Sequence, residues 1–340
     1  MECSERVRKA IQCQTVDRVP AGLFGTHPDY EHGLAAYVGC ATVEEMYRKL
    51  QIDVWHTGGL TYRGHADVYR GRPIDTGYAL YWEHNPDPPF ADLESSELVE
   101  SYSFPTMADY DETALLQEID SHDEFALCTG INSALFHNYL YMCGQENGLC
   151  YLKSDPDIAH AIIRRITDFW VSYLDHVLDI AGHRATFVEN CNDFGSQRTM
   201  LISPEDFRSF FKPQLQRLYD TAHRHGVLYM QHSCGAVSPI IEDFIEMGAD
   251  VLNPIQISAS GMSLAEIAAR FHGRIALYGG IDTQYLLPQG PVNEIQAAVR
   301  QALNLFGRDG GYILSGSQGL MDDIPYKHAV AMLDPALRMA

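Results

Sequence analysis

The chain has 340 residues, of which 46% are hydrophobic and 20% charged, and this composition is typical of a globular protein with a large core. Its formal net charge of −21 argues against binding to nucleic acid or to anionic membranes, because both require a basic surface. The charged N-terminus, the lack of a long apolar stretch and eight cysteines without CxxC spacing predict a soluble cytoplasmic protein with reduced thiols.

Short apolar runs recur along the chain, and a helical pattern follows each of them. The eight runs cover residues 19–24, 52–56, 125–130, 185–190, 227–232, 250–255, 275–280 and 312–317. Each run is apolar on both faces, as expected for strands that helices cover on both sides. The helix over 158–180 should begin at Asp155-Pro156 with Asp155 as its cap, and the next helix should begin at Ser203-Pro204.

Alternation of strands and helices predicts a parallel sheet, and eight such units predict a closed (β/α)8 TIM barrel, here a single domain over 1–340. A doubly wound open sheet is the alternative, but the segment Phe24-Gly25-Thr26-His27-Pro28 lacks the glycine-rich turn of its dinucleotide fingerprint. Residues 57–124 interrupt the alternation, and the aromatic stretch 75–83 within them predicts an inserted hairpin. This hairpin is expected either to cover the barrel mouth as a lid or to pack on the outside.

Polar side chains gather where the expected strands end. In a (β/α)8 barrel the carboxyl ends of the strands carry the reacting groups. We therefore expect His232 and Asp193 to take part in catalysis. The side chains expected to contact a substrate are His27, His56, Asn190, Asn192, Asn253, Asp282 and Gln318.

The segment His232-Ser233-Cys234-Gly235 predicts a metal site. Residues i and i+2 of an extended segment point the same way, and a thiolate together with an imidazole suits zinc. A third protein ligand is required, and Glu189 or Cys191 on the neighbouring strand could supply it. The alternative is a packed histidine and a buried thiol, with Glu189 a hydrogen-bonded carboxylate at the rim.

Several motifs together resemble the uroporphyrinogen decarboxylase superfamily over nearly the whole chain. They are Arg6-Val7, Asp17-Arg18-Val19-Pro20, 192–197, His232-Ser233-Cys234-Gly235, 250–256, 279–284 and 311–315. The resemblance implies a (β/α)8 barrel. True decarboxylases of this superfamily carry an arginine-bearing segment after the first strand and a Gly-His-Gly near the last one. Here residues 21–30 contain no arginine, and Ser317-Gln318-Gly319 stands in the second place.

The resemblance therefore favours the zinc-dependent methyltransferases that work with corrinoid proteins. It implies His232 and Cys234 as zinc ligands, whereas Gln318 takes the place of a later cysteine ligand. The segment Asp120-Ser121-His122 lacks the glycine of a corrinoid-binding motif, so a separate protein would supply the corrinoid. The implied reaction is zinc-assisted transfer of a methyl group between a small methylated compound, or a small acceptor, and that protein. The alternatives are a decarboxylase and a barrel that binds a ligand without converting it.

Overall fold

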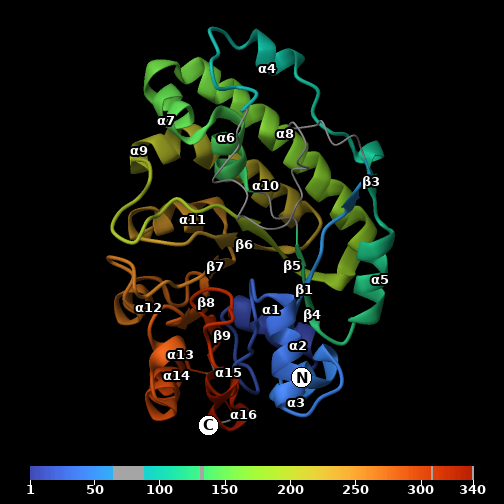
Figure 1. Cartoon of the computed structure of the whole chain (residues 1–340), viewed down its shortest axis with the longest axis vertical. Helices are drawn as coiled ribbons and strands as arrows, with labels where there is room; N and C mark the ends of the chain where they lie inside the picture. The colour runs from blue at the N-terminus through green and yellow to red at the C-terminus, as the bar shows by residue number, and fades with distance from the viewer. Residues whose placement is uncertain (64–87, 131–133, 308, 339–340) are drawn as a thin grey trace.

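A computed structural model describes residues 1–63, 88–130, 134–307 and 309–338. Its main feature is one parallel sheet of seven strands in the order β1-β4-β5-β6-β7-β8-β9 (Figure 1). The strands are β1 (Val54–Thr57), β4 (Ala126–Gly130), β5 (Ala185–Cys191), β6 (Leu228–His232), β7 (Val251–Asn253), β8 (Ala276–Ile281) and β9 (Tyr312–Gly316). Seven of the eight apolar runs therefore form strands, as the sequence predicts.

The first predicted strand, over 19–24, is reduced to two bridging residues, which corrects the expectation of eight full strands. Ala21 pairs in parallel with Leu314 of β9, and Gly22 pairs in parallel with Val54 of β1. The two edges of the sheet are thus joined, as in a TIM-barrel-like fold. The pairing is short because Pro20 has no N–H to donate to a ladder.

Helices surround this sheet. Those between β1 and β8 are α4 (Glu97–Ser101), η2 (Met107–Asp109), α5 (Thr113–Ser121), α6 (Leu135–Cys143), α7 (Gln145–Ser154), α8 (Pro156–Ala181), η3 (Gly182–Arg184), α9 (Pro204–Asp206), η4 (Phe207–Phe211), α10 (Lys212–Arg224), η5 (Ser238–Ile240), α11 (Ile241–Met247) and α12 (Leu264–Phe271). The others are α1 (Cys3–Ile11), α2 (Pro28–Tyr37), α3 (Val43–Leu50), α13 (Leu286–Gln289), α14 (Val292–Phe306), α15 (Tyr326–Leu333) and α16 (Pro335–Arg338). Figure 1 places α6–α8 and α10 toward one end of the molecule and α2, α3 and α13–α16 toward the other, with α11 near the middle.

The helix boundaries follow local chemistry. Ser203 accepts a hydrogen bond from the backbone N–H of Asp206 and so caps α9. Asp155 precedes α8 as predicted, but its side chain makes no capping hydrogen bond, which corrects that detail. Its backbone ψ of 63° departs from the extended value that an N-cap residue usually has.

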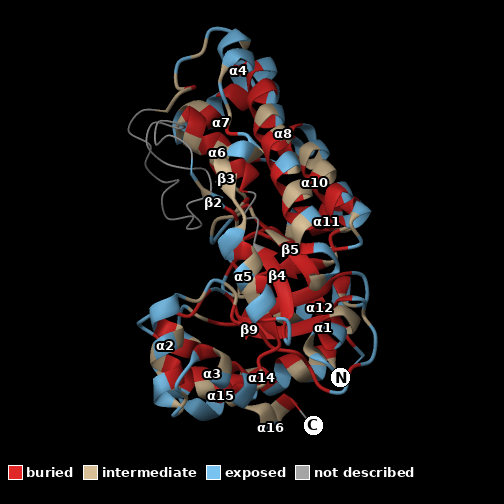
Figure 2. Ribbon diagram, turned by 90° about the vertical axis from the view of Figure 1, so that its right-hand side faces the viewer, coloured by how far each residue is buried: buried red, intermediate tan, exposed pale blue. Residues whose placement is uncertain are grey.

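The interior of the sheet is apolar and closed at one end. Alternate residues such as Ala126 and Cys128 point inward to a cluster with Phe187 and Tyr278, and Val7 of α1 belongs to the same cluster. Figure 2 shows the strands almost wholly buried between the helical groups. Because α1 contacts β1, β4, β5, β8 and β9, it covers one end of the sheet and leaves the carboxyl ends of the strands as the mouth.

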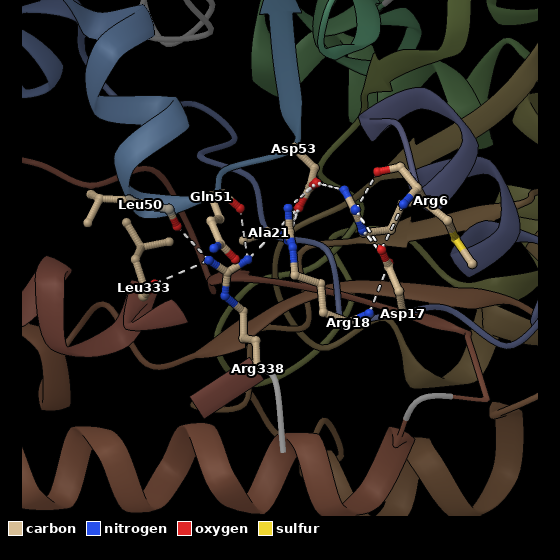
Figure 3. A network of polar contacts seen from close by, with 10 residues as sticks. Arg6, Asp17, Arg18, Ala21, Leu50, Gln51, Asp53, Leu333 and Arg338 are labelled. Carbon is tan, nitrogen blue, oxygen red and sulfur yellow. Dashed lines mark hydrogen bonds and ion pairs between the residues drawn. The ribbon is translucent and has the colours of Figure 1, made fainter. Parts of the chain in front are cut away.

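A buried polar network ties the chain ends together beneath the strands (Figure 3). The Asp53 carboxylate, immediately before β1, accepts hydrogen bonds from Arg6 at 2.7 Å and from Arg18 at 2.7 and 2.8 Å. Arg338 of α16 donates to the backbone carbonyls of Leu50 and Gln51. Each of these buried charges therefore has polar partners, as charges require away from water.

The predicted hairpin over 75–83 lies outside the described residues, so its role as a lid stays a prediction. Of the interrupting segment, β2 (Thr61–Tyr62) pairs antiparallel with β3 (Tyr110–Asp111). Helices α4 and α5 pack against α8. Among the described residues, no helix is both long enough and apolar enough to span a membrane.

Candidate active site

His232 lies at the carboxyl end of β6 with its side chain buried and oriented by a neighbour. Its Nδ1 is 2.6 Å from Oδ1 of Asn253, its partner in the register of β6 and β7. The amide orientation of Asn253 is fixed because its Nδ2 donates to the carbonyl of Tyr278. Since Oδ1 can only accept a hydrogen bond, Nδ1 of His232 carries a proton. The other ring nitrogen, Nε2, faces the mouth and is the atom that would bind a metal.

Asp193 and Cys234 approach this nitrogen from two loops. The Nε2 atom of His232 lies 3.3 Å from Oδ1 of Asp193 and 3.5 Å from Sγ of Cys234. The same Asp193 oxygen accepts the backbone N–H of Cys234 at 2.7 Å. Gly235 allows this approach, because its φ is +86° and an added Cβ would lie 2.3 Å from the carbonyl carbon of Gly195.

The charges around His232 favour a cation. Burial disfavours the charged imidazole, but the neighbouring thiols and carboxylate outweigh it and raise the pKa of His232 well above its usual range. Burial also disfavours the ionised Asp193, yet hydrogen bonding and charge from His232 hold its pKa well below the usual range. Burial raises the pKa of the Cys234 thiol to about 11, so a metal would have to displace its proton.

These three side chains fit zinc. Their donor atoms all lie within 4.8 Å of one another. Tetrahedral zinc, with bonds of about 2.0–2.1 Å to nitrogen or oxygen and about 2.3 Å to sulfur, keeps N and O about 3.3 Å apart and N and S about 3.5 Å apart. The distances around His232 match both values, so Asp193, His232 and Cys234 could hold this ion.

The group opens on a cavity of about 550 Å³. Its lining consists of Gly195, Ser196, Gln197, Cys234, Gly235, Gln256, Thr283, Gln284, Gln318, Gly319, Met321, Asp323 and Ile324. Gln318, in the loop after β9, donates from Nε2 to Sγ of Cys234 at 3.2 Å. In the described part of the chain this lining contains neither lysine nor arginine, and Asp323 is its one ionisable carboxyl group.

The two expected third ligands take different positions. Cys191 pairs with His232 in the register of β5 and β6, and it interacts with the imidazole. Glu189, two residues earlier, instead contacts His56 at 3.2 Å and Cys128 at 3.4 Å. Along a strand, residues i and i+2 are about 6.6 Å apart, so Glu189 and Cys191 reach different points of the barrel.

The remaining predicted substrate contacts are mostly engaged by the protein. Asn190 is buried, donates to Gln231 and accepts the backbone N–H of His232. Asn192 is also buried and accepts the backbone N–H of Phe136. Both amides therefore support the strand ends from within.

Asp282 and His27 cap helices. The Asp282 carboxylate accepts the backbone N–H groups of Gln284, Tyr285 and Leu286, the last of which begins α13. His27 accepts the backbone N–H of Asp29 at the start of α2, and it is largely exposed. Helix starts leave free N–H groups, and these side chains satisfy some of them.

Two residues of the site have no motif in the sequence. The Phe24 ring packs at a tilt against His232, at 4.8 Å between ring centres, and edge-on against His56 at 5.4 Å. His137 of α6 accepts the backbone N–H of Asp193 at 3.4 Å. The aromatic ending of the run 19–24 could have indicated Phe24, but nothing local links His137 to a loop 56 residues away.

The chain is similar to known proteins of two activities. The family model for uroporphyrinogen decarboxylase (URO-D) matches residues 87–338. The uroporphyrinogen decarboxylase of Flavobacterium johnsoniae is 29% identical over 55% of this chain and 50% of its own length. The methylcobamide:CoM methyltransferase MtaA of Methanosarcina barkeri is 28% identical over 39% of this chain and 36% of its own length. The chain thus matches half or less of the length of these curated relatives.

A solved methyltransferase structure from Methanosarcina mazei has the same fold. It superposes with a TM-score of 0.72 over 98% of this chain and 97% of its own, at 17% sequence identity. The family model covers more than half of the chain. The motifs, the fold and this match agree, and the chain belongs to the uroporphyrinogen decarboxylase family.

Proposed function

We propose that this chain is a zinc-dependent methyltransferase that moves a methyl group between a small methylated compound, or a small acceptor, and a separate corrinoid protein. The observation that carries the proposal is the spacing of Asp193, His232 and Cys234, three zinc-type donors at the mouth of the sheet. Similarity to a relative named as a methylcobamide:CoM methyltransferase supports it.

Each residue has a part in this proposal. His232, Cys234 and Asp193 would hold the ion, and Asn253 keeps Nε2 of His232 turned toward it. A zinc ion in such a site supplies Lewis acidity, which lowers the pKa of an accepting thiol or hydroxyl or polarises a methyl donor. The uncharged amides and glycines of the cavity suit a small, weakly charged compound.

Decarboxylation of a porphyrinogen is the second candidate, and the family match favours it. The cavity argues against it, because the described lining offers no cation to pair with carboxylates. A bound polycarboxylate needs arginines or lysines that pair with its carboxylates. Without them, the carboxylates would be buried as charges without partners.

Methylcobalamin provides a direct test, since it can stand in for a corrinoid protein. Purified protein is expected to contain zinc and to demethylate methylcobalamin with a thiol such as coenzyme M, followed by the change in corrinoid absorbance. Cys234→Ala should lose the zinc ion of this group and the activity, because two ligands bind the ion far less tightly than three.

Cys143→Ser is the matched control, since Cys143 is a buried thiol of α6 outside the group. It should keep both metal and activity. Activity that survives in Cys234→Ala protein that has lost the zinc ion of this group would overturn the proposal.

A further inference from the structure

A second set of metal-binding side chains lies inside the barrel. His56 lies in β1, Cys128 in β4 and Glu189 in β5, and these three strands are neighbours in the sheet. His56 and Cys128 are register partners, so their side chains leave the sheet side by side. The sequence offers Glu189 or Cys191 as a third ligand beside His232, whereas in the structure Glu189 contacts His56 and Cys128.

The distances resemble those of a zinc site. Oε2 of Glu189 lies 3.2 Å from Nδ1 of His56 and 3.4 Å from Sγ of Cys128, and the donor atoms of all three lie within 4.8 Å of one another. Tetrahedral zinc keeps N and O ligands about 3.3 Å apart and O and S ligands about 3.5 Å apart. The set of imidazole, thiol and carboxylate is also one that zinc takes.

A further contact orients the histidine. The Tyr278 hydroxyl lies 3.1 Å from Nε2 of His56, on the side away from Glu189. Metal-binding histidines commonly use their second nitrogen in such a hydrogen bond, which fixes the ring. Tyr278 can reach His56 because Gly22 has no side chain: an added Cβ there would lie 1.9 Å from the tyrosine oxygen.

The charge balance leaves room for a cation. Cys128 is fully buried, the Glu189 side chain is 15% exposed, and the surrounding interior is apolar. Among the residues that the structure describes, no lysine or arginine forms an ion pair with Glu189, and His56 is its one ion-pair partner. A divalent ion would balance the carboxylate and a thiolate together, which His56 alone cannot do.

This cluster shares no donor residue with the first group. The Phe24 ring contacts both histidines, at 5.4 Å from His56 and 4.8 Å from His232 between ring centres. The His56 side chain is 18% exposed, so the cluster still communicates with solvent. The two sets of donors are therefore distinct and can be removed one at a time.

We propose that His56, Cys128 and Glu189 form a second zinc site, separate from the group of Asp193, His232 and Cys234. Three protein ligands leave a fourth position for water or for a heteroatom of a bound compound, as in catalytic zinc sites. This inference does not depend on the proposed methyl transfer.

Zinc content of the purified full-length protein tests it, measured by inductively coupled plasma mass spectrometry after dialysis. The wild type should hold two zinc ions per chain, and Cys128→Ser should hold one. His56→Gln removes a different ligand of the same site and should also leave one zinc ion per chain. It replaces Cys128→Ser in the test if the serine variant does not fold. Cys143→Ser should keep both ions, and circular dichroism should show that each variant is folded.

Cobalt substitution identifies which thiolate binds. The cobalt form of Cys234→Ala should keep a thiolate-to-cobalt charge-transfer band from Cys128, and adding Cys128→Ser should abolish it. The second site would be overturned if the wild type held one zinc ion per chain that is lost in Cys234→Ala and kept in Cys128→Ser. That result would leave the proposed function standing. The reverse pattern would support the second site and overturn the proposed function.

Discussion

A single hydrogen bond from His232 to Asn253 determines which nitrogen of the His232 ring faces the cavity. The Oδ1 atom of Asn253 lies 2.6 Å from Nδ1 of His232. Loss of such an outer contact to a metal-binding histidine typically weakens metal binding by about 10–100-fold. Asn253→Leu, which keeps the volume and removes the acceptor, is expected to lower zinc affinity by that factor.

Competition with a chromophoric chelator measures this change. Asn147→Leu is the matched control, because its amide donates to the backbone of Ala91, away from the strand ends. Equal zinc affinity of the two variants would contradict the orienting role of Asn253.

Gly22 is a second position where adding a single carbon atom should change the stability of the protein. Because its Cβ would lie 1.9 Å from the Tyr278 hydroxyl, Gly22→Ala must displace that ring. Overpacking of this kind typically costs about 1–3 kcal/mol, so the free energy of unfolding of the variant should fall by about that amount. Urea denaturation measures this fall as a lower midpoint concentration. Gly58→Ala serves as control, since the nearest atom to its added Cβ is 3.5 Å away. Equal stability of the two variants would show that Tyr278 moves freely.

At the scale of elements, seven of the eight strands could be predicted because buried parallel strands leave unmistakable apolar runs. The position of the zinc-type donors at strand ends follows from the same periodicity. The contacts of Glu189 with His56 and Cys128 could not be predicted from the sequence. They depend on the register of β5 against β4 and β1, which sets how far along the barrel the Glu189 side chain lies. The contact of His137 with the Asp193 backbone escapes prediction for a similar reason: it joins α6 to a loop that only the folded sheet brings near.

The network around Asp53 joins α1, the segment before Ala21 and β1. Asp53→Asn keeps the shape but removes the charge that Arg6 and Arg18 pair with. Breaking a buried ion pair costs about 3–5 kcal/mol, so the free energy of unfolding should fall by roughly this amount. Chemical denaturation measures it, with Asp179→Asn as an exposed control whose loss should be within about 0.5 kcal/mol. A fall no larger than that of the control would contradict the buried pairing.

At the scale of the whole molecule, charge is the property that we expect to disfavour porphyrinogen chemistry. A protein of net charge −21 whose described cavity lining holds no lysine or arginine should repel an octacarboxylate. We expect no formation of coproporphyrinogen from uroporphyrinogen above the rate without enzyme, followed by chromatography of the oxidised porphyrins. A uroporphyrinogen decarboxylase assayed in parallel is the positive control. Turnover comparable to that control would make decarboxylation the preferred function.

The closing of the sheet through Ala21 and Gly22 also has a consequence for how the chain is made. Ala21 pairs with Leu314, the Tyr30 hydroxyl donates to the carbonyl of Ile324, and Arg338 binds the carbonyl of Leu50. A ribosome releases residues in order, so none of these contacts can form before the residues of 314–338 that make them have emerged. Until then the nascent sheet carries two open strand edges, which are prone to pair with other chains. We therefore expect closure of the barrel to follow the pairing of the other strands, because it needs residues from both 21–22 and 314–338.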